Sequence, residues 1–276
     1  SPASSLLSRL FEGDGGALGA LTAGGAVAGV GFPAVASFLG VRVGWRVAVA
    51  FGGIVAVPVA VAIARTVPPL RPASPERELR TAFDPARIVG LLARPAVLYT
   101  TLLAVMTGFT FQAFASFFPT FLVQYRGLAT GTAGLAFAGV FGLSAVAPPV
   151  AGRFSDDVSR DAAIAGSVAL AGGGIATLLF VPGLVGLLLG AGLLGVGISW
   201  PGSIQARFMD QFDAEERGFG FGLVRTFYML LAASGSVVVG TLADVGVWPL
   251  AYGAVVGLLG CCLLALALNR GLGLGL

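Results

Sequence analysis

The sequence predicts an all-α protein that crosses a lipid bilayer several times, and three observations support this fold class. Hydrophobic residues make up 57% of the chain and charged residues only 11%, with a mean hydropathy of +0.94, whereas a soluble domain carries about 25% charged residues. Eight continuous apolar runs follow one another, and each is close to the roughly 20 residues that a helix needs to cross a bilayer. The runs do not alternate apolar and polar residues as the strands of a membrane barrel would. Helices are therefore expected.

The eight runs give the expected helices in order. Their limits are Ala17–Leu39, Trp45–Ala64, Ala96–Val123, Thr132–Ala151, Ala162–Val181, Gly183–Gln205, Gly218–Leu242 and Val247–Leu268. The links between them are short except for Arg65–Arg94, which is rich in proline and contains six arginines. Such composition is typical of a linker. We therefore expect two helices in residues 1–64, a central loop in residues 65–94 and a six-helix bundle in residues 95–276.

The positions of the arginines predict the orientation. All 16 basic residues are arginine. If the chain crosses eight times, twelve arginines fall on the side of the long link, Arg225 lies inside a span, and three lie on the opposite side, namely Arg42, Arg46 and Arg126. Positive loops stay in the cytoplasm. We therefore expect a multi-pass protein of the cell (inner or plasma) membrane, with the long link and both ends of this chain in the cytoplasm. Topology, rather than nucleic-acid binding, explains the basic pI of about 9.3.

The residue types that are absent exclude several kinds of chemistry. The chain has no histidine, which excludes histidine-based catalysis and histidine metal sites. Cys261 and Cys262 are adjacent within an apolar run, where small buried hydrophobic side chains are the simplest interpretation. No cluster of acids or cysteines lies at one membrane face. We therefore expect no catalytic residues, no cofactor and no metal, and the protein is not expected to be an enzyme.

A charged link, Gly152–Asp161, joins two of the apolar runs in a tight hairpin. Asp156 and Arg160 are four residues apart and can pair on one helical turn. We hypothesise that Asp156 also reaches Arg207 and then faces the start of the first span near Gly15–Gly19, where a helix N-terminus carries positive potential. This contact would close the cytoplasmic side. The alternative is a solvated loop that obeys the positive-inside rule.

The hairpin resembles the signature of the major facilitator superfamily of secondary transporters, G-x-x-x-D-[RK]-x-G-R-[RK]. Gly152, Asp156 and Arg160 match this signature, while Asp157, Ser159 and Asp161 depart from it. Gly24–Gly40 with Pro33 resembles the fifth helix of the family, which is rich in glycine and proline, and Gly44-Trp45-Arg46 resembles the start of the sixth. Phe117–Leu122 resembles the end of the seventh helix.

The resemblance implies a bundle of this family, in which the eight spans are helices five to twelve. The first two spans would end the N-terminal half, and the other six would form the C-terminal half. A weak repeat at an offset of 203 residues aligns Trp45 with Trp248. By this reasoning about four helices would precede Ser1.

Several residues are candidates for lining a substrate cavity. Arg225 is the one charge inside a span, and charges at such depth usually face a cavity or a partner. Arg225 can therefore hold an anionic substrate, with Tyr228 one turn further on, or its side chain can extend to the membrane surface. The other candidates are Gln112, Trp200 and Gln205, for which packing is the alternative.

Glycine and proline indicate how the helices pack and bend. Three glycine pairs have the spacing of close helix contacts: Gly25/Gly29, Gly186/Gly190 and Gly253/Gly257. The prolines expected to bend their helices are Pro33, Pro119, Pro148, Pro149 and Pro201.

Together these observations predict a secondary active transporter, or permease, that moves a small solute across the bilayer by alternating access. The alternative is a partner-dependent permease subunit or a transporter-like sensor. The expected partners are the lipid bilayer and a small-molecule substrate, without nucleic acid. The coupling ion, the direction of transport and the oligomeric state stay open. No Asp or Glu lies within an expected span, so an acid for proton coupling would have to lie in the helices expected before Ser1.

Overall fold

The computed structural model describes residues 31–32, 35–36, 38–40, 42–66, 85–213 and 217–276. Every regular element in these ranges is a helix. Seven helical segments are long and apolar enough to cross a membrane: Trp45–Thr66, Pro95–Gln124, Thr130–Asp157, Arg160–Phe180, Gly183–Gln211, Gly218–Asp244 and Trp248–Gly271. The fold is an all-α polytopic membrane fold, as the sequence predicts. The first expected span, Ala17–Leu39, lies mostly outside the described residues.

The chain divides into two compact units, Ser1–Arg77 and Glu78–Leu276, and each unit is described by itself. In the first unit, α3 (Trp45–Thr66) is apolar along its length and has no buried residue. The guanidinium of Arg46 lies 4.7 Å from the centre of the Trp45 ring at the start of this helix. An aromatic ring beside a cation is typical of a helix end at a membrane interface.

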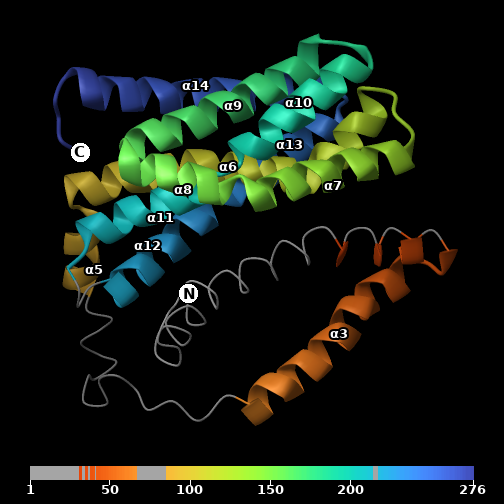
Figure 1. Cartoon of the computed structure of the whole chain (residues 1–276), viewed down its shortest axis with the longest axis horizontal. Helices are drawn as coiled ribbons and strands as arrows, with labels where there is room; N and C mark the ends of the chain where they lie inside the picture. Colours follow the sequence, from red (N-terminus) through yellow and green to blue (C-terminus); the bar gives the residue numbers. More distant parts are fainter. Residues whose placement is uncertain (1–30, 33–34, 37, 41, 67–84, 214–216) are drawn as a thin grey trace. The chain divides into compact units, whose positions relative to one another are not determined.

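The second unit contains six of the seven candidate spans. Its helices are α5 (Pro85–Leu92), α6 (Pro95–Gln124), α7 (Thr130–Val146), α8 (Pro148–Asp157), α9 (Arg160–Phe180), α10 (Gly183–Gly197), α11 (Trp200–Gln211), α12 (Arg217–Ala232), α13 (Ser234–Asp244) and α14 (Trp248–Gly271). Within this unit α9 packs against α10 and α14, and α6 packs against α12 and α13 (Figure 1).

Three of these six spans are broken into two helices. The breaks before α8 and α11 coincide with Pro148 and Pro201, each within the first two residues of the new helix. Proline lacks the N–H group that would continue the preceding helix, and it is well accommodated in a first turn. The third break, at Ala233 between α12 and α13, contains no proline. Pro119 lies inside α6 without interrupting it, and Pro33 is outside the described residues.

The link between α8 and α9 is shorter than the ten polar residues that the sequence predicted. Helix α8 continues through Gly152 to Asp157, so only Val158 and Ser159 separate it from α9. Ser159 is the N-cap of α9, and its Oγ accepts a hydrogen bond from the backbone N–H of Ala162 at 3.0 Å. The cap satisfies one of the free N–H groups of the first turn. A two-residue link therefore fixes the ends of two helices close together.

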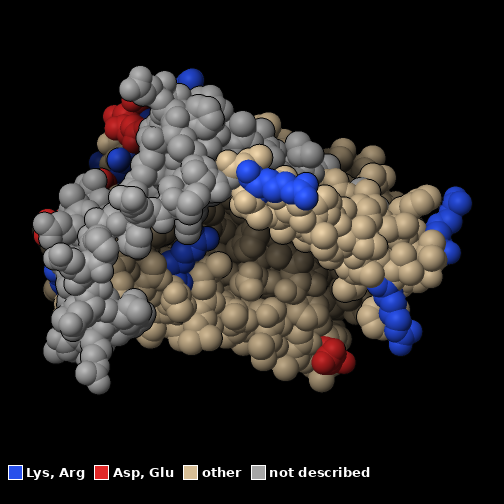
Figure 2. All heavy atoms as spheres, turned by 90° about the horizontal axis from the view of Figure 1, so that it is seen from below, with Lys and Arg blue, Asp and Glu red and all other residues tan. Residues whose placement is uncertain are grey.

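Helices α6 and α9 supply much of the apolar core of the second unit. Phe114, Phe118 and Phe121 of α6 are each 1% exposed, and Phe121 contacts Tyr252 of α14 with ring centres 4.5 Å apart. Many other apolar side chains are exposed, including Leu135 (76%) and Leu184 (67%). Figure 2 shows a broad surface of uncharged residues with few charged side chains among them. Such exposure is expected of helices whose solvent is lipid.

Glycines bring α9 and α10 into close contact. A Cβ atom at Gly174 would lie 2.6 Å from the backbone nitrogen of Leu194, and one at Gly190 would lie 2.5 Å from Cγ of Leu178. In the predicted pair Gly186/Gly190, the close contact of Gly190 with another helix is therefore confirmed. A Cβ at Gly186 would instead meet the backbone oxygen of Val181, which lies just before the start of the same helix. A Cβ at Gly253 or Gly257 would meet nothing within 4 Å among the described residues, so a close contact at this pair stays a prediction. Gly25 and Gly29 lie outside the described residues.

We predict that Gly174→Ala destabilises the protein by about 1–3 kcal/mol, because the added methyl group meets backbone atoms of α10 that cannot rotate away. The measurement is unfolding in detergent by denaturant. The control is Gly173→Ala on the same helix, where the added Cβ has open space and removal of a helical glycine should be neutral or stabilise by up to about 1 kcal/mol. Equal effects of the two substitutions would contradict the close contact.

Candidate functional site

Polar and charged side chains gather at one end of the helices of the second unit. They come from the first two turns of α6 and the first turn of α9, and from the last two turns of α11 and the last turns of α8 and α14: Tyr99, Thr100, Ser155, Asp156, Arg160, Asp161, Arg207, Asp210, Gln211 and Asn269. We call this set the end cluster. It contains two groups of ion pairs that differ in burial, one around Arg207 and one around Arg160.

Arg207 is the buried centre of the first group. The residue is only 8% exposed, and its Nη1 forms an ion pair with Oδ1 of Asp161 in the first turn of α9. Its Nε donates to Thr100 Oγ1 on α6 at 3.0 Å, and its Cζ lies 5.3 Å from the centre of the Tyr99 ring. One guanidinium therefore connects α11 with α6 and α9. Its burial is tolerated because the planar donor groups are paired.

Two amides extend this group. Asn269 of α14 donates to Asp161 Oδ2 at 3.3 Å, so the second carboxylate oxygen is also occupied. Gln211 donates to Thr100 Oγ1 at 2.8 Å, and the hydroxyl of Thr100 itself donates to the backbone carbonyl of Ala96 at 2.9 Å. Arg207 also donates to the backbone oxygen of Leu276. Side chains of four helices, α6, α9, α11 and α14, thus share one hydrogen-bonded network.

Arg160 forms the second group at the exposed surface of the same end. Its Nη1 pairs with Oδ1 of Asp156 and its Nε with Oδ2 of Asp210, the latter at 3.1 Å. The Arg160 side chain is 29% exposed, whereas Asp156 is 67% and Asp210 57% exposed. Ser155 also accepts from Arg160, at 3.3 Å. Exposed pairs of this kind contribute little to stability, about 0–1 kcal/mol. They can therefore break and re-form at small cost.

The structure changes one part of the predicted arrangement. Asp156 and Arg160 do pair, as their spacing suggests, but Arg207 pairs with Asp161 rather than with Asp156. Asp161 lies in the first turn of α9 and its side chain is 26% exposed, whereas Asp156 lies in the last turn of α8 and its side chain is 67% exposed. The region near Gly15–Gly19, which was expected to face Asp156, lies outside the described residues. A Cβ at Gly152, the first residue of the signature, would meet nothing within 4 Å.

Sequence reasoning missed Asp161, Asp210, Thr100, Gln211 and Asn269. Asp210 and Gln211 were placed in a loop because the expected span ended at Gln205, whereas α11 continues to Gln211. Asp161 was judged only as a departure from the signature. Its position two residues after a serine that can cap a helix was the available signal.

The predicted cavity residues lie on α6, α11 and α12 and differ in their exposure. Trp200 is 2% exposed and belongs to the core. Tyr228 is half-buried and stacks on Phe208 of α11 with ring centres 6.2 Å apart, while Gln112 is half-buried in α6 and Gln205 is exposed on α11. Arg225 is exposed on α12, with its Cζ 6.0 Å from the centre of the Phe221 ring.

The described residues contain no group of three or more His, Cys, Asp or Glu side chains that could hold a metal ion. The charged groups of the end cluster are instead paired within it, whereas the hydroxyl of Tyr99 and Oε1 of Gln211 are buried without a hydrogen-bond partner among the described residues. The cluster is therefore suited to holding helix ends together and to exchanging ion pairs at the surface.

Comparison with known protein families identifies the chain. The family model described as the Major Facilitator Superfamily matches it over two overlapping stretches, residues 1–207 and 100–271. The chain belongs to the Major Facilitator Superfamily. This assignment agrees with the seven apolar helices and with the resemblance of the hairpin to the signature of this family, and it makes the protein a membrane transporter. A search of curated proteins found no match.

We predict strong coupling between Arg207 and Asp161. Arg207→Met should reduce the free energy of unfolding by about 2–4 kcal/mol, because it leaves a carboxylate that is 26% exposed without its partner. Adding Asp161→Asn should restore about 1–3 kcal/mol of this loss. The measurement is a double-mutant cycle of unfolding in detergent.

The matched control for this cycle is the exposed pair of Arg160 and Asp156, for which the coupling should not exceed about 1 kcal/mol. Additive losses at Arg207 and Asp161, or a larger coupling in the exposed pair, would contradict the proposed difference between the two groups.

Proposed function

We propose that this member of the Major Facilitator Superfamily is a secondary active transporter that moves a small solute by alternating access. The family match, which extends from residue 1 to residue 271, carries the proposal. We also propose that residues 95–276 form one six-helix half of the transporter and that the link of residues 65–94, which includes the short helix α5, lies on the cytoplasmic side, since six of the sixteen arginines lie in this link.

Broken helices support a mechanism in which the cavity opens alternately to the two sides. Three of the six spans in the second unit are interrupted, at α7/α8, α10/α11 and α12/α13. Interrupted helices allow one end of a span to tilt while the other end stays packed. The close contact of α9 with α10 through Gly174 and Gly190 would keep the remaining core of the unit rigid during such a movement.

The two groups of the end cluster would have different roles in this mechanism. The network of Arg207, Asp161 and Asn269 is largely buried and would hold four helix ends together in every state. The pairs of Arg160 with Asp156 and Asp210 are exposed and would exchange partners as the cytoplasmic side opens. Asp156 and Arg160, which match the signature, are therefore proposed as the gating residues, with Arg207 as a positioning residue.

Arg225 is the residue that we propose for substrate contact. It is exposed on α12 and pairs with no carboxylate among the described residues. A cation within a membrane span is most stable beside water or an anion. An anionic small solute, held by Arg225 with Tyr228 three residues further along the helix, is therefore the proposed substrate class.

The test of the function is counterflow in proteoliposomes. Vesicles preloaded with an unlabelled organic anion are diluted into a trace of the labelled anion, and a panel of small carboxylates and phosphates is compared. A carrier predicts transient accumulation of the label, because the labelled anion enters while the unlabelled anion inside competes with it for the exit site. Movement that rises linearly with concentration without counterflow, or that requires a second protein, would favour a channel or a partner-dependent subunit.

In the same assay we predict that Asp156→Asn slows exchange about five- to tenfold, a typical size for coupling between two states. The reason is the loss of the exposed pair with Arg160. Asp157→Asn is the matched control, because the neighbouring carboxylate is also exposed and has no ion pair in the described part of the chain. Membrane insertion, measured by the yield of folded protein in detergent, should be unchanged in both variants. Normal exchange by Asp156→Asn would contradict the gating role.

A further inference from the structure

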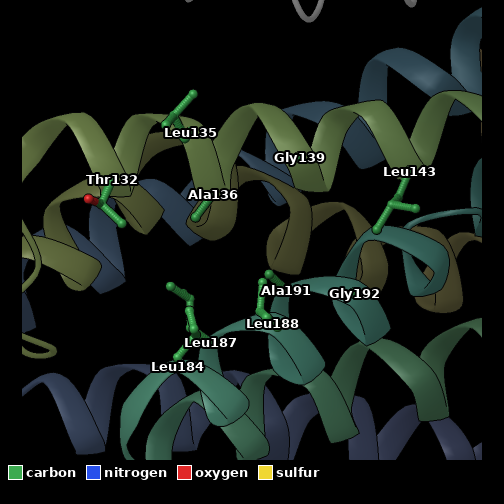
Figure 3. A pocket seen from close by; sticks show the side chains of 10 residues that line it. All are labelled: Thr132, Leu135, Ala136, Gly139, Leu143, Leu184, Leu187, Leu188, Ala191 and Gly192. Atoms are coloured by element: carbon green, nitrogen blue, oxygen red, sulfur yellow. The ribbon is translucent and has the colours of Figure 1, made fainter.

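An apolar groove lies between α7 and α10, away from the end cluster. Its volume is about 410 Å³, which is within the roughly 300–1,000 Å³ of small-molecule sites. Ten residues line it, and Thr132 is the one polar side chain among them. Figure 3 shows side chains of α7, including Ala136 and Leu143, on one side of the groove and those of α10, including Leu187 and Leu188, on the other.

The groove is closed at one end and open at the other. At the closed end a Cβ on Gly195 of α10 would lie 2.8 Å from Cβ of Leu143 on α7, so the two helices touch. At the open end the lining residues are Thr132 and Leu184, near the first residues of their helices. From Leu184 to Gly192 the groove follows α10 for about 12 Å. One leaflet of a bilayer core is roughly 15 Å deep, so the groove extends through most of one leaflet.

A cation lies beside the open end. Arg126, in the link before α7, donates from Nη2 to the backbone oxygen of Gly183 at 2.9 Å, next to the lining residue Leu184. Its Nη1 donates to the backbone oxygens of Leu178 and Val181. These contacts use three of the five N–H groups of the guanidinium, and no carboxylate of the described residues pairs with it. A positive charge and two N–H groups therefore remain for an anion at the membrane surface.

We propose that this groove binds one acyl chain of a glycerophospholipid whose phosphate pairs with Arg126. The chain would enter at Thr132 and Leu184 and end where Gly195 contacts Leu143. The apolar lining suits the hydrocarbon chain, and the charge of Arg126 is complementary to the phosphate, with which arginine pairs well. The bound lipid would fill the space between α7 and α10, two helices that belong to the same unit. This site is independent of the proposed transport function.

The test uses the full chain in nanodiscs of phosphatidylcholine that contain a small fraction of phosphatidylglycerol with a photoactivatable diazirine in one acyl chain. Cross-linked residues are identified by mass spectrometry. Leu188 is 63% exposed, while Leu250 and Leu264 of α14 are 60% and 59% exposed. The proposal predicts about tenfold more label on Leu188 than on these two comparators. Equal labelling would mean ordinary contact with bulk lipid and would overturn the proposal.

A filled groove gives the second part of the test. In Gly139→Leu combined with Gly192→Leu, the added side chains enter the groove from positions where a Cβ meets nothing within 4 Å. Label on Leu188 should fall about tenfold, to the level of Leu250. The control is Gly260→Leu on α14, which also has space and should leave the label on Leu188 unchanged. Retained label on Leu250 shows that the variant is folded. Unchanged labelling of Leu188 in the filled variant would overturn the proposal.

The role of Arg126 is tested on the unchanged protein. A diacylglycerol probe with the same diazirine chain lacks the phosphate, so it should label Leu188 several-fold less than the phosphatidylglycerol probe at equal mole fraction. Equal labelling by the two probes would overturn the phosphate contact with Arg126. Cross-linking of the groove to a protein segment in place of lipid would overturn the proposed occupant.

Discussion

The absence of water from the bilayer core is the constraint on which the rest of this structure depends. Backbone N–H and C=O groups in hydrocarbon must find hydrogen-bond partners within the protein, and a helix provides them within one segment. The seven long apolar helices of the described residues follow from this constraint. The same constraint places charged side chains at helix ends. In the second unit Asp156, Arg160 and Arg207 all lie at one end, so each interaction between charges is also an interaction between helix termini.

Burial then divides these charges into two kinds. A buried guanidinium such as that of Arg207 is stable only with its partners in place, which makes the network around it a fixed connection among four helices. The pair of Arg160 and Asp156 remains in contact with water, where its formation and loss have nearly equal free energy. A transporter with two conformations needs both rigid units and contacts that change. The end cluster has the physical properties for both.

The spans could be predicted from the sequence because a continuous apolar run is a strong signal. The described helices begin and end within six residues of the predicted limits, with the largest difference where α8 continues to Asp157 and α11 to Gln211. These two extensions were missed because their residues are polar, although polar residues can continue a helix beyond the membrane surface. The breaks at Pro148 and Pro201 were predictable from proline chemistry, whereas the break at Ala233 has no such signal.

Contacts between helices were harder to predict. Gly186/Gly190 and Gly253/Gly257 have the same spacing. Among the described residues, however, only Gly190 of these four lies so close to another helix that an added Cβ would collide with it. Spacing identifies a helix face but does not identify what packs against it. For the same reason the sequence led to Asp156 as the partner of Arg207, and the pairing with Asp161 became visible only with the ends of α8 and α9. The cavity residues, among them Arg225 and Gln112, stay predictions.

The most direct test is the side of the membrane on which residues 65–94 lie, because the predicted orientation of the protein depends on the arginines of this link. Ser74→Cys, in a background of Cys261→Ser and Cys262→Ala, is exposed to a membrane-impermeant maleimide in intact cells and after permeabilisation. Ala129→Cys, in the link of the opposite side, is the control. The account predicts that Ser74→Cys reacts only after permeabilisation and that Ala129→Cys reacts in intact cells. Reaction of Ser74→Cys in intact cells would contradict it.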